Sequence, residues 1–267
     1  MADLQGWALI LGASSGFGAA AGKALAEAGL DIFGVHLDRR ATMPVVDAAR
    51  EAIEAAGRRA IFFNINAADA ERRAETLDAM AAQLEEDGRG GGVHVLMHSL
   101  AFGTLLPYVA TEEGGKVLSQ RQVEMTVDVM AHSLVYWSQE VVSRGLMGNG
   151  GRIFAMTSSG GTRIIPSYGA VSSAKAALES HIRQLAFELG PRGITANCLR
   201  AGVTDTPALR KIPGSERLLS EAARRNPTGR LTTPEDVAGA IVALSGPGAG
   251  FISGNVIGVD GGEDIVG

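Results

Sequence analysis

A glycine-rich stretch near the amino terminus, Gly12-Ala13-Ser14-Ser15-Gly16-Phe17-Gly18, decides the fold. It follows the apolar run 7–11 and leads into the helical pattern 19–29. Glycine lets the backbone turn tightly here, and it lets a pyrophosphate approach the amide groups at the positive end of a helix. The spacing is Gly-x3-Gly-x-Gly rather than the commoner Gly-x-Gly-x-x-Gly. Such a trio can also serve packing alone, but between a strand and a helix it predicts a dinucleotide site.

Short apolar runs alternate with longer helical patterns along the rest of the chain. The runs predicted as strands are 7–11, 31–36, 60–64, 93–97, 152–156, 193–199 and 255–259. The segments predicted as helices are 19–29, 45–57, 69–87, 120–146, 168–190 and 234–244. The strand runs are apolar on both faces, which is typical of a parallel sheet that helices cover on both sides. The expected fold class is therefore α/β, a Rossmann-like doubly wound parallel sheet of about seven strands, with ligands at the carboxyl ends of the strands.

Composition limits the possible classes of protein. The chain has 267 residues, 46% of them hydrophobic, and a formal charge of −5. We find no repeat or linker-like stretch and expect one domain over 1–267. A single cysteine, Cys198, excludes a disulfide framework and a cysteine-based zinc site, and we expect no metal. No apolar run reaches the roughly 20 residues that span a bilayer, and the acidic balance argues against nucleic acid as a partner. These features favour a cytoplasmic protein without membrane or nucleic-acid partners.

Tyr168 and Lys175 stand seven residues apart at the start of the predicted helix 168–190. Seven steps of about 100° fall about 20° short of two turns, so both side chains leave one helix face, about 10.5 Å apart along the axis. A nicotinamide ribose can bridge this gap if the lysine holds its hydroxyls while the tyrosine faces the substrate. The lysine charge would then lower the pKa of Tyr168. The alternative is that Tyr168 only packs and Lys175 is an ordinary surface lysine.

The glycine turn and the late Val259-Asp260-Gly261-Gly262 resemble the short-chain dehydrogenase/reductase superfamily, and the likeness covers the whole chain. One departure is Leu11, where that family carries threonine. Its usual members have Tyr-x3-Lys, which would require a lysine at Ser172. Tyr-x6-Lys is the spacing of its enoyl-acyl-carrier-protein reductases.

Three further segments are similar to those reductases. His98-Ser99-Leu100-Ala101 looks like their segment after the fourth strand, and 199–206 looks like their nicotinamide loop. Met130 replaces the helix asparagine that ordinary members use for proton relay, and a thioether cannot organise a relay water as an amide can.

Two departures from the commonest enoyl reductases make the third bacterial type, which is NADPH-dependent, the better match. The commonest type has another tyrosine ten residues before the catalytic one, where this chain has Ser158, and its glycine turn is stretched. The stretch 205–230 also looks closer to the third type. Ser158 could instead orient a ketone, which would favour carbonyl reduction.

The resemblance also implies which residues contact the nucleotide. After the strand 31–36, Asp38 lies slightly late for the ribose hydroxyls, whereas Arg39 and Arg40 could clamp a 2′-phosphate, which favours NADPH over NADH. The alternative is a solvated charged turn. The expected contacts are Gly12, Ser14, Ser15, Gly16, Phe17, Gly18, Arg39, Arg40, Asn64, Ile65, Ser99, Leu100, Ala101, Lys175, Gly202, Val203, Thr204 and Thr206.

The segment 205–230 is the expected substrate lid. Its part 207–230 carries six basic against two acidic side chains, a net charge of +4, with apolar residues interleaved. Such a segment could cover an acyl chain and help to dock an acidic acyl carrier protein. The alternative is a solvated amphipathic helix.

These observations predict an NAD(P)H-dependent enoyl-[acyl-carrier-protein] reductase of fatty acid biosynthesis. It would reduce the trans-2 double bond of acyl-carrier-protein or coenzyme A thioesters, with Tyr168, Lys175 and Ser158 as catalytic residues. A carbonyl reductase or alcohol dehydrogenase, acting on a 3-oxoacyl or other ketone, and a non-catalytic nucleotide sensor are the alternatives. Homotetramers are usual in the family, and the helices 120–146 and 168–190 could supply the contacts.

Overall fold

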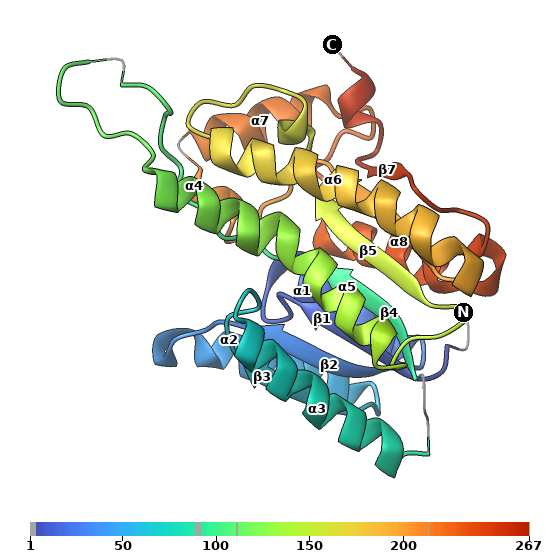
Figure 1. The fold of residues 1–267 in the computed structure, drawn as a ribbon. Coiled ribbons are helices and arrows are strands. Elements are labelled where there is room, and N and C mark those ends of the chain that lie inside the picture. Colours follow the sequence, from blue (N-terminus) through green and yellow to red (C-terminus); the bar gives the residue numbers. More distant parts are fainter. Residues whose placement is uncertain (1–3, 89–91, 111, 213, 267) are drawn as a thin grey trace.

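A seven-stranded parallel sheet forms the centre of the computed structural model (Figure 1). The strands are β1 (Trp7–Leu11), β2 (Asp31–His36), β3 (Ala60–Asn64), β4 (Val93–His98), β5 (Arg152–Thr157), β6 (Thr195–Ala201) and β7 (Val256–Val259). Their order is β3-β2-β1-β4-β5-β6-β7, and every neighbouring pair is parallel. The structure describes residues 4–88, 92–110, 112–212 and 214–266, so residue 213 of the predicted lid and both ends of the predicted domain 1–267 lie outside it. The predicted fold class is confirmed.

Helices cover both faces of this sheet (Figure 1). The helices α1 (Gly16–Glu27), α2 (Met43–Ala55) and α8 (Pro234–Ser245) bury their apolar side chains against one face. The helices α3 (Ala70–Glu86), α5 (Ser133–Ser143) and α6 (Gly169–Leu189) cover the other face. Successive strand residues alternate between the two cores, because neighbouring side chains of a strand point to opposite faces.

The long helix predicted over 120–146 is interrupted, so that prediction is wrong in its middle. It consists of α4 (Gln120–Val127), the π-helical turn η2 (Asp128–His132) and α5. The buried side chain of Met130 lies in this π turn. Single π turns inside helices are frequent near functional sites, and this one directly precedes Ser133, which contacts the end of β4.

The amphipathic helix that the sequence offered as the alternative for the lid is present in part of it. The lid contains α7 (Ser215–Arg225), which buries only Ala222, and the short turn η5 (Leu209–Lys211) precedes it. Along the described residues, no helix is long and apolar enough to span a membrane.

Candidate active site

The glycine-rich turn forms a close-packed cradle at the carboxyl ends of β1 and β4. Gly12 has φ +93°, and a Cβ there would lie 2.5 Å from the carbonyl oxygen of Ser99. A Cβ on Gly18 would lie 1.9 Å from the oxygen of Gly12. No larger residue fits at either position. The backbone of the turn therefore packs directly against the backbone of Ser99, just after β4. Leu100 packs next to Gly12, which brings the predicted segment 99–101 to the turn.

The amino end of α1 suits a pyrophosphate. Ser15 precedes the helix in extended conformation, its side chain makes no capping hydrogen bond, and the first turn holds no acid. The first amide groups of the helix and its positive end are therefore available to an anion. The methyl group of Thr206 lies 3.7 Å from a Cβ placed on Gly16, so the predicted nicotinamide loop meets this turn. The residues present fit a dinucleotide.

The end of β2 places an acid beside the turn, where the sequence suggested that it came too late. The Nδ1–H of His36 donates to the Asp38 carboxylate at 3.1 Å. Partial burial raises the pKa of this carboxyl, but hydrogen bonds from Thr42, Ser14 and His36 outweigh that effect and lower the pKa below its usual value. The Asn64 amide holds the Asp38 backbone with two hydrogen bonds, of 2.9 and 3.0 Å. Arg39 and Arg40 are exposed on the same loop.

Tyr168 is fixed by the backbone before it and by a glycine beneath it. Ser167 has φ +62°, the one described non-glycine residue with positive φ, and such strain persists where the surroundings impose it. A Cβ on Gly160 would lie 2.6 Å from Cε1 of Tyr168, so the ring lies directly against this glycine. Burial raises the pKa of Tyr168, and a hydrogen bond with the Ser158 side chain opposes part of that effect. Tyr168 and Ser158 therefore lie together.

Lys175 lies deeper than the sequence suggested. Its side chain is buried, and Nζ donates to the carbonyl oxygen of Met156 on β5 at 2.7 Å. Burial lowers the pKa of Lys175 to about 8, although Cys198 and Glu179 act in the opposite direction. The expected lowering of the pKa of Tyr168 by this lysine is not found, because the influences on the phenol are burial and Ser158. Lys175 is also not a surface lysine, which removes that alternative.

His98 was missed as a site residue. It is fully buried at the end of β4, opposite Ala155 in the register with β5. The Ser133 hydroxyl donates to the Val129 carbonyl at 2.8 Å, so the His98 Nε2–H must donate to Ser133 at 2.9 Å. This leaves Nδ1 as a buried acceptor with no partner among the described residues. Burial, followed by the charge on Lys175, lowers the pKa of His98 to about 3, so the ring is neutral.

Acidic partners neutralise much of the positive charge that the lid carries in sequence. Four of its six cations form ion pairs with acids: Arg210 with Asp205, Arg217 with Glu221, Arg225 with Glu263 and Arg230 with Asp236. Three of these acids lie outside 207–230. Lys211 and Arg224 have no ion pair among the described residues, so the net charge of +4 overstates the field that a partner would meet.

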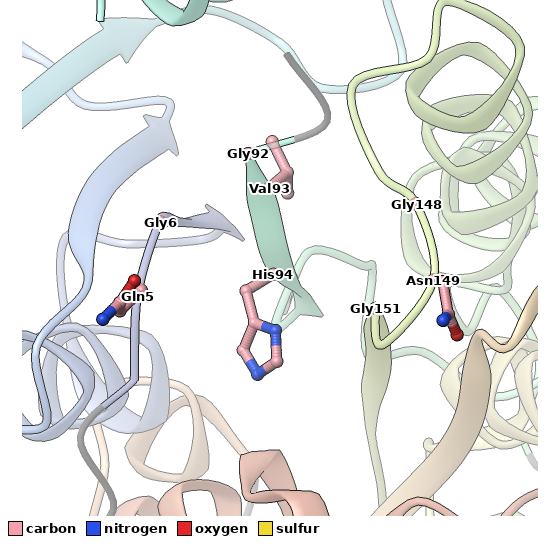
Figure 2. Close-up of a pocket in the computed structure, with 8 residues that line it drawn as sticks. All are labelled: Gln5, Gly6, Gly92, Val93, His94, Gly148, Asn149 and Gly151. Carbon is pink, nitrogen blue, oxygen red and sulfur yellow. The ribbon is translucent and has the colours of Figure 1, made fainter. Parts of the chain in front are cut away.

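A pocket at the opposite edge of the sheet, shown in Figure 2, contains none of the predicted site residues. Glycines that precede β1, β4 and β5 line it together with His94 and Asn149. The Nε2–H of His94 donates to the carbonyl of Ser245 at the end of α8. We interpret this pocket as a packing feature.

Comparisons with known proteins agree with this geometry. The family model described as Enoyl-(Acyl carrier protein) reductase matches residues 12–263. The chain is 32% identical to an enoyl-[acyl-carrier-protein] reductase [NADH] of Aquifex aeolicus over 66% of this chain and 64% of that enzyme. It is also 32% identical to a 3-oxoacyl-[acyl-carrier-protein] reductase of Aggregatibacter actinomycetemcomitans, over 95% of this chain and 97% of that one. A short-chain dehydrogenase of Burkholderia cenocepacia, solved with NADP, superposes with a TM-score of 0.81 at 29% identity, covering 98% of this chain and 99% of the other.

The structure thus brings the predicted segments 12–18, 38–40, 64–65, 99–101 and 202–206 to one edge of the sheet, with Ser158, Tyr168 and Lys175. Of these, Ser158 and Tyr168 contact each other, and Lys175 is held by the sheet beneath them.

Proposed function

The chain belongs to the Enoyl-(Acyl carrier protein) reductase family within the short-chain dehydrogenase/reductase superfamily, and from this premise we propose that it reduces the trans-2 double bond of enoyl thioesters. The observation that supports the proposal most is the Tyr168–Lys175 spacing on α6. The tyrosine stands at the amino end of this helix and the lysine two turns further along it, both at the nucleotide edge of the sheet. Met130, buried in the π turn, provides no amide for the proton relay of ordinary members.

When bound, a reduced nicotinamide nucleotide supplies hydride for the β-carbon of the substrate. The residues that would hold it are the glycine turn, the segment 99–101, the loop 202–206 and Lys175. As the double bond is reduced, negative charge develops on the thioester oxygen as an enolate. Tyr168 donates a hydrogen bond to this oxygen, and its raised pKa keeps the phenol protonated for that purpose at neutral pH. The α-carbon then takes a proton from Tyr168 or water, which completes the reduction.

We propose NADPH as the nucleotide, with NADH as the alternative. The guanidinium groups of Arg39 and Arg40 are exposed at the end of β2, where a 2′-phosphate can be bound in a bidentate manner. The ionised Asp38 beside Ser14 works against this phosphate and would suit ribose hydroxyls instead. The preference therefore depends on whether two arginines outweigh one carboxylate.

Carbonyl reduction is the second candidate, and the Ser158–Tyr168 contact favours it. A serine hydroxyl next to the tyrosine can orient a ketone oxygen toward the same phenol. The similarity to a 3-oxoacyl reductase over nearly the whole chain points in the same direction.

The deciding experiment follows the loss of NADPH absorbance with crotonyl and acetoacetyl thioesters, each repeated with NADH. Rapid oxidation with the crotonyl substrate alone supports the enoyl reductase. Oxidation with the acetoacetyl substrate alone would contradict it and assign Ser158 to orienting the ketone. If neither substrate oxidises the nucleotide, both assignments are wrong for these acyl groups.

We also propose a carrier-protein or coenzyme A thioester as substrate and a homotetramer as the assembly. Among the described residues no strand pairs with the outer side of β7, and Phe251 and Phe187 are exposed in segments near it. Such apolar side chains suit contact with another copy of the chain. Light scattering coupled to size-exclusion chromatography tests this assembly.

A further inference from the structure

The chain after β7 makes a tight turn that several other segments contact. The Asp260 carboxylate accepts the N–H groups of Gly262 and Asp264 at 3.0 and 3.3 Å. Gly261 and Gly262 both have positive φ, which lets the chain reverse directly into the short helix η7 (Glu263–Ile265). The turn is therefore ordered by its own hydrogen bonds. Figure 1 shows this last segment, in red, next to α7.

Glu263 in this turn is a buried carboxylate with two partners. One oxygen accepts the backbone N–H of Val203 at 3.0 Å, and the other accepts Nη2 of Arg225 at 3.1 Å. Only 5% of the Glu263 side chain is exposed, so the charge depends on these two contacts. A Cβ on Gly202 would lie 2.9 Å from this carboxylate, so glycine at 202 permits the approach.

The two partners belong to the two segments that the reaction needs to be placed together. Val203 lies in the loop 202–206, which is proposed to hold the nicotinamide. Arg225 is the last residue of the lid helix α7, where a cation also suits the negative helix end. Within the parts of the chain that the structure describes, Arg225–Glu263 is the only ion pair that joins α7 to another segment.

The packing of α7 makes this ion pair more important. The helix buries only Ala222, so apolar contacts hold it weakly. The following Asn226 reaches the same turn, because its Nδ2 donates to the Asp260 carbonyl at 2.8 Å. Loop and lid thus share one attachment, the turn after β7, and the loop is also bonded to β7 through the Gly202 N–H and the Val259 carbonyl.

We propose that Glu263 is a positioning residue that couples the lid helix α7 to the nicotinamide loop. When the nucleotide fixes the loop 202–206, the Val203 N–H orients the Glu263 carboxylate. This carboxylate in turn holds Arg225 and with it the lid helix α7. This inference rests on the proposed function only in naming the loop as a nucleotide contact. It assigns to Glu263 no contact with substrate.

Limited trypsin digestion tests the coupling without any turnover. The rate of cleavage after Arg217, a bond that every variant retains, is measured with and without NADPH, at concentrations that NADPH fluorescence shows to be saturating. In the wild-type protein we expect the nucleotide to slow this cleavage by about tenfold. In Glu263→Gln, which is isosteric and retains an acceptor for Val203, the protection should fall to about twofold or less, and NADPH affinity should fall about fivefold. Arg225→Met should lose as much protection as Glu263→Gln, and the variant with both substitutions should lose no more than either alone. Arg225→Lys should keep most of the protection. Glu51→Gln and Arg192→Met serve as controls that should keep the wild-type protection, because both residues are exposed and distant in sequence from α7 and Glu263.

The outcomes separate this proposal from the proposed function. If Glu263 only stabilises the fold, both cleavage rates rise together and the protection ratio stays at the wild-type value, which would overturn the coupling. Equal, additive effects of the two single variants would also overturn it. If NADPH fails to bind, the same digestion with NADH tests the coupling. Absence of activity on crotonyl thioester would refute the proposed substrate and leave the digestion result unaffected.

Discussion

Two buried cations lie at opposite ends of the strand β5, and they differ in their hydrogen-bond partners. Arg152 starts β5 and Lys175 contacts its far end. Burial lowers the pKa of both side chains. The guanidinium of Arg152 donates to the carbonyls of Gly150, Gly151 and Gly246, next to the end of α8 where His94 also donates. Within the described part of the chain, Lys175 makes one hydrogen bond, to the Met156 carbonyl, and its ammonium has two further N–H groups.

The difference shows that burial and a perturbed pKa do not by themselves identify a site. At the amino ends of the strands, Arg152 donates to three backbone carbonyls, one of them at the end of α8, which is a structural role, and its Nε–H has no partner among the described residues. At the carboxyl ends, Lys175 and His98 also have unused hydrogen-bonding groups, and the difference is that these lie near a glycine turn that admits a ligand. We therefore expect substitutions at the amino edge to change stability and those at the carboxyl edge to change chemistry.

The largest effect is expected for Tyr168→Phe. Removing the hydroxyl takes away the hydrogen bond to the enolate oxygen, so turnover should fall about 10³-fold. NADPH affinity, measured by fluorescence, should stay within about threefold, because the phenol is assigned to the substrate. Full turnover in this variant would remove Tyr168 from the chemistry.

Lys175→Met should lower turnover by less than Tyr168→Phe does, and yet stabilise the nucleotide-free protein by about 1–3 kcal/mol at pH 7. In the wild-type protein, the folded state bears the cost of the buried ammonium below pH 8. Between about pH 8 and the usual lysine value of 10.5, the folded state has lost this proton while the unfolded state keeps it, so wild-type stability rises with pH. Denaturant unfolding of both proteins should show their difference narrowing over that interval. A destabilised variant at pH 7 would contradict this account of Lys175.

Arg152→Met, at the other end of β5, should lower stability and leave the chemistry unchanged. It leaves three backbone carbonyls without this donor, and we expect a loss of about 2–3 kcal/mol in the free energy of unfolding. The kcat of the folded fraction should remain at the wild-type value, since no predicted site residue lies near. A lower kcat without loss of stability would break the distinction between the two edges.

The strands and the glycine turn could be predicted because their signals are local. The bounds of β1, β2 and β3 match the predicted 7–11, 31–36 and 60–64, and α6 starts one residue after the predicted 168. The π turn could not be predicted, because no proline or glycine interrupts 128–132 and the partner of Ser133 is His98 on β4. The helix α7 was predicted only as the alternative for the lid, an amphipathic helix; its apolar side chains do lie on one side, but it buries a single residue and adds little to the core.

The site was predictable in its residues but not in its depth. Tyr168 and Lys175 stand out by spacing, whereas the position of Nζ depends on a carbonyl of β5 that no pattern in α6 reveals. Glu263 gave no signal of its own, since its partners Val203 and Arg225 lie 60 and 38 residues away in sequence.

A smaller effect is expected at the end of β2. Replacing Arg39 and Arg40 together by Gln should lower kcat/KM with NADPH about tenfold and leave that with NADH nearly unchanged. Asp38→Asn should act in the opposite direction by improving NADPH, because it removes a charge next to the phosphate. Equal losses with both nucleotides would show that the loop does not discriminate between them.

The smallest effect concerns the lid. Because the other four lid cations have acidic partners, we expect Lys211→Glu with Arg224→Glu to raise KM for an acyl-carrier-protein thioester by about threefold at low salt, with no change for coenzyme A thioesters. Reversal of Arg225 would be uninformative here, since it also breaks the pair with Glu263. Equal changes on both substrates would refute docking by this surface.

The central claim is that hydride goes to the β-carbon of an enoyl thioester, and isotope tracing in a competition tests it most directly. The protein is mixed with equal amounts of crotonyl and acetoacetyl thioesters and with NADPH carrying deuterium at C4, and the products are separated by mass spectrometry. The account predicts butyryl thioester with deuterium at its β-carbon as the main product. Deuterium found mainly at the carbinol carbon of 3-hydroxybutyryl thioester would contradict it.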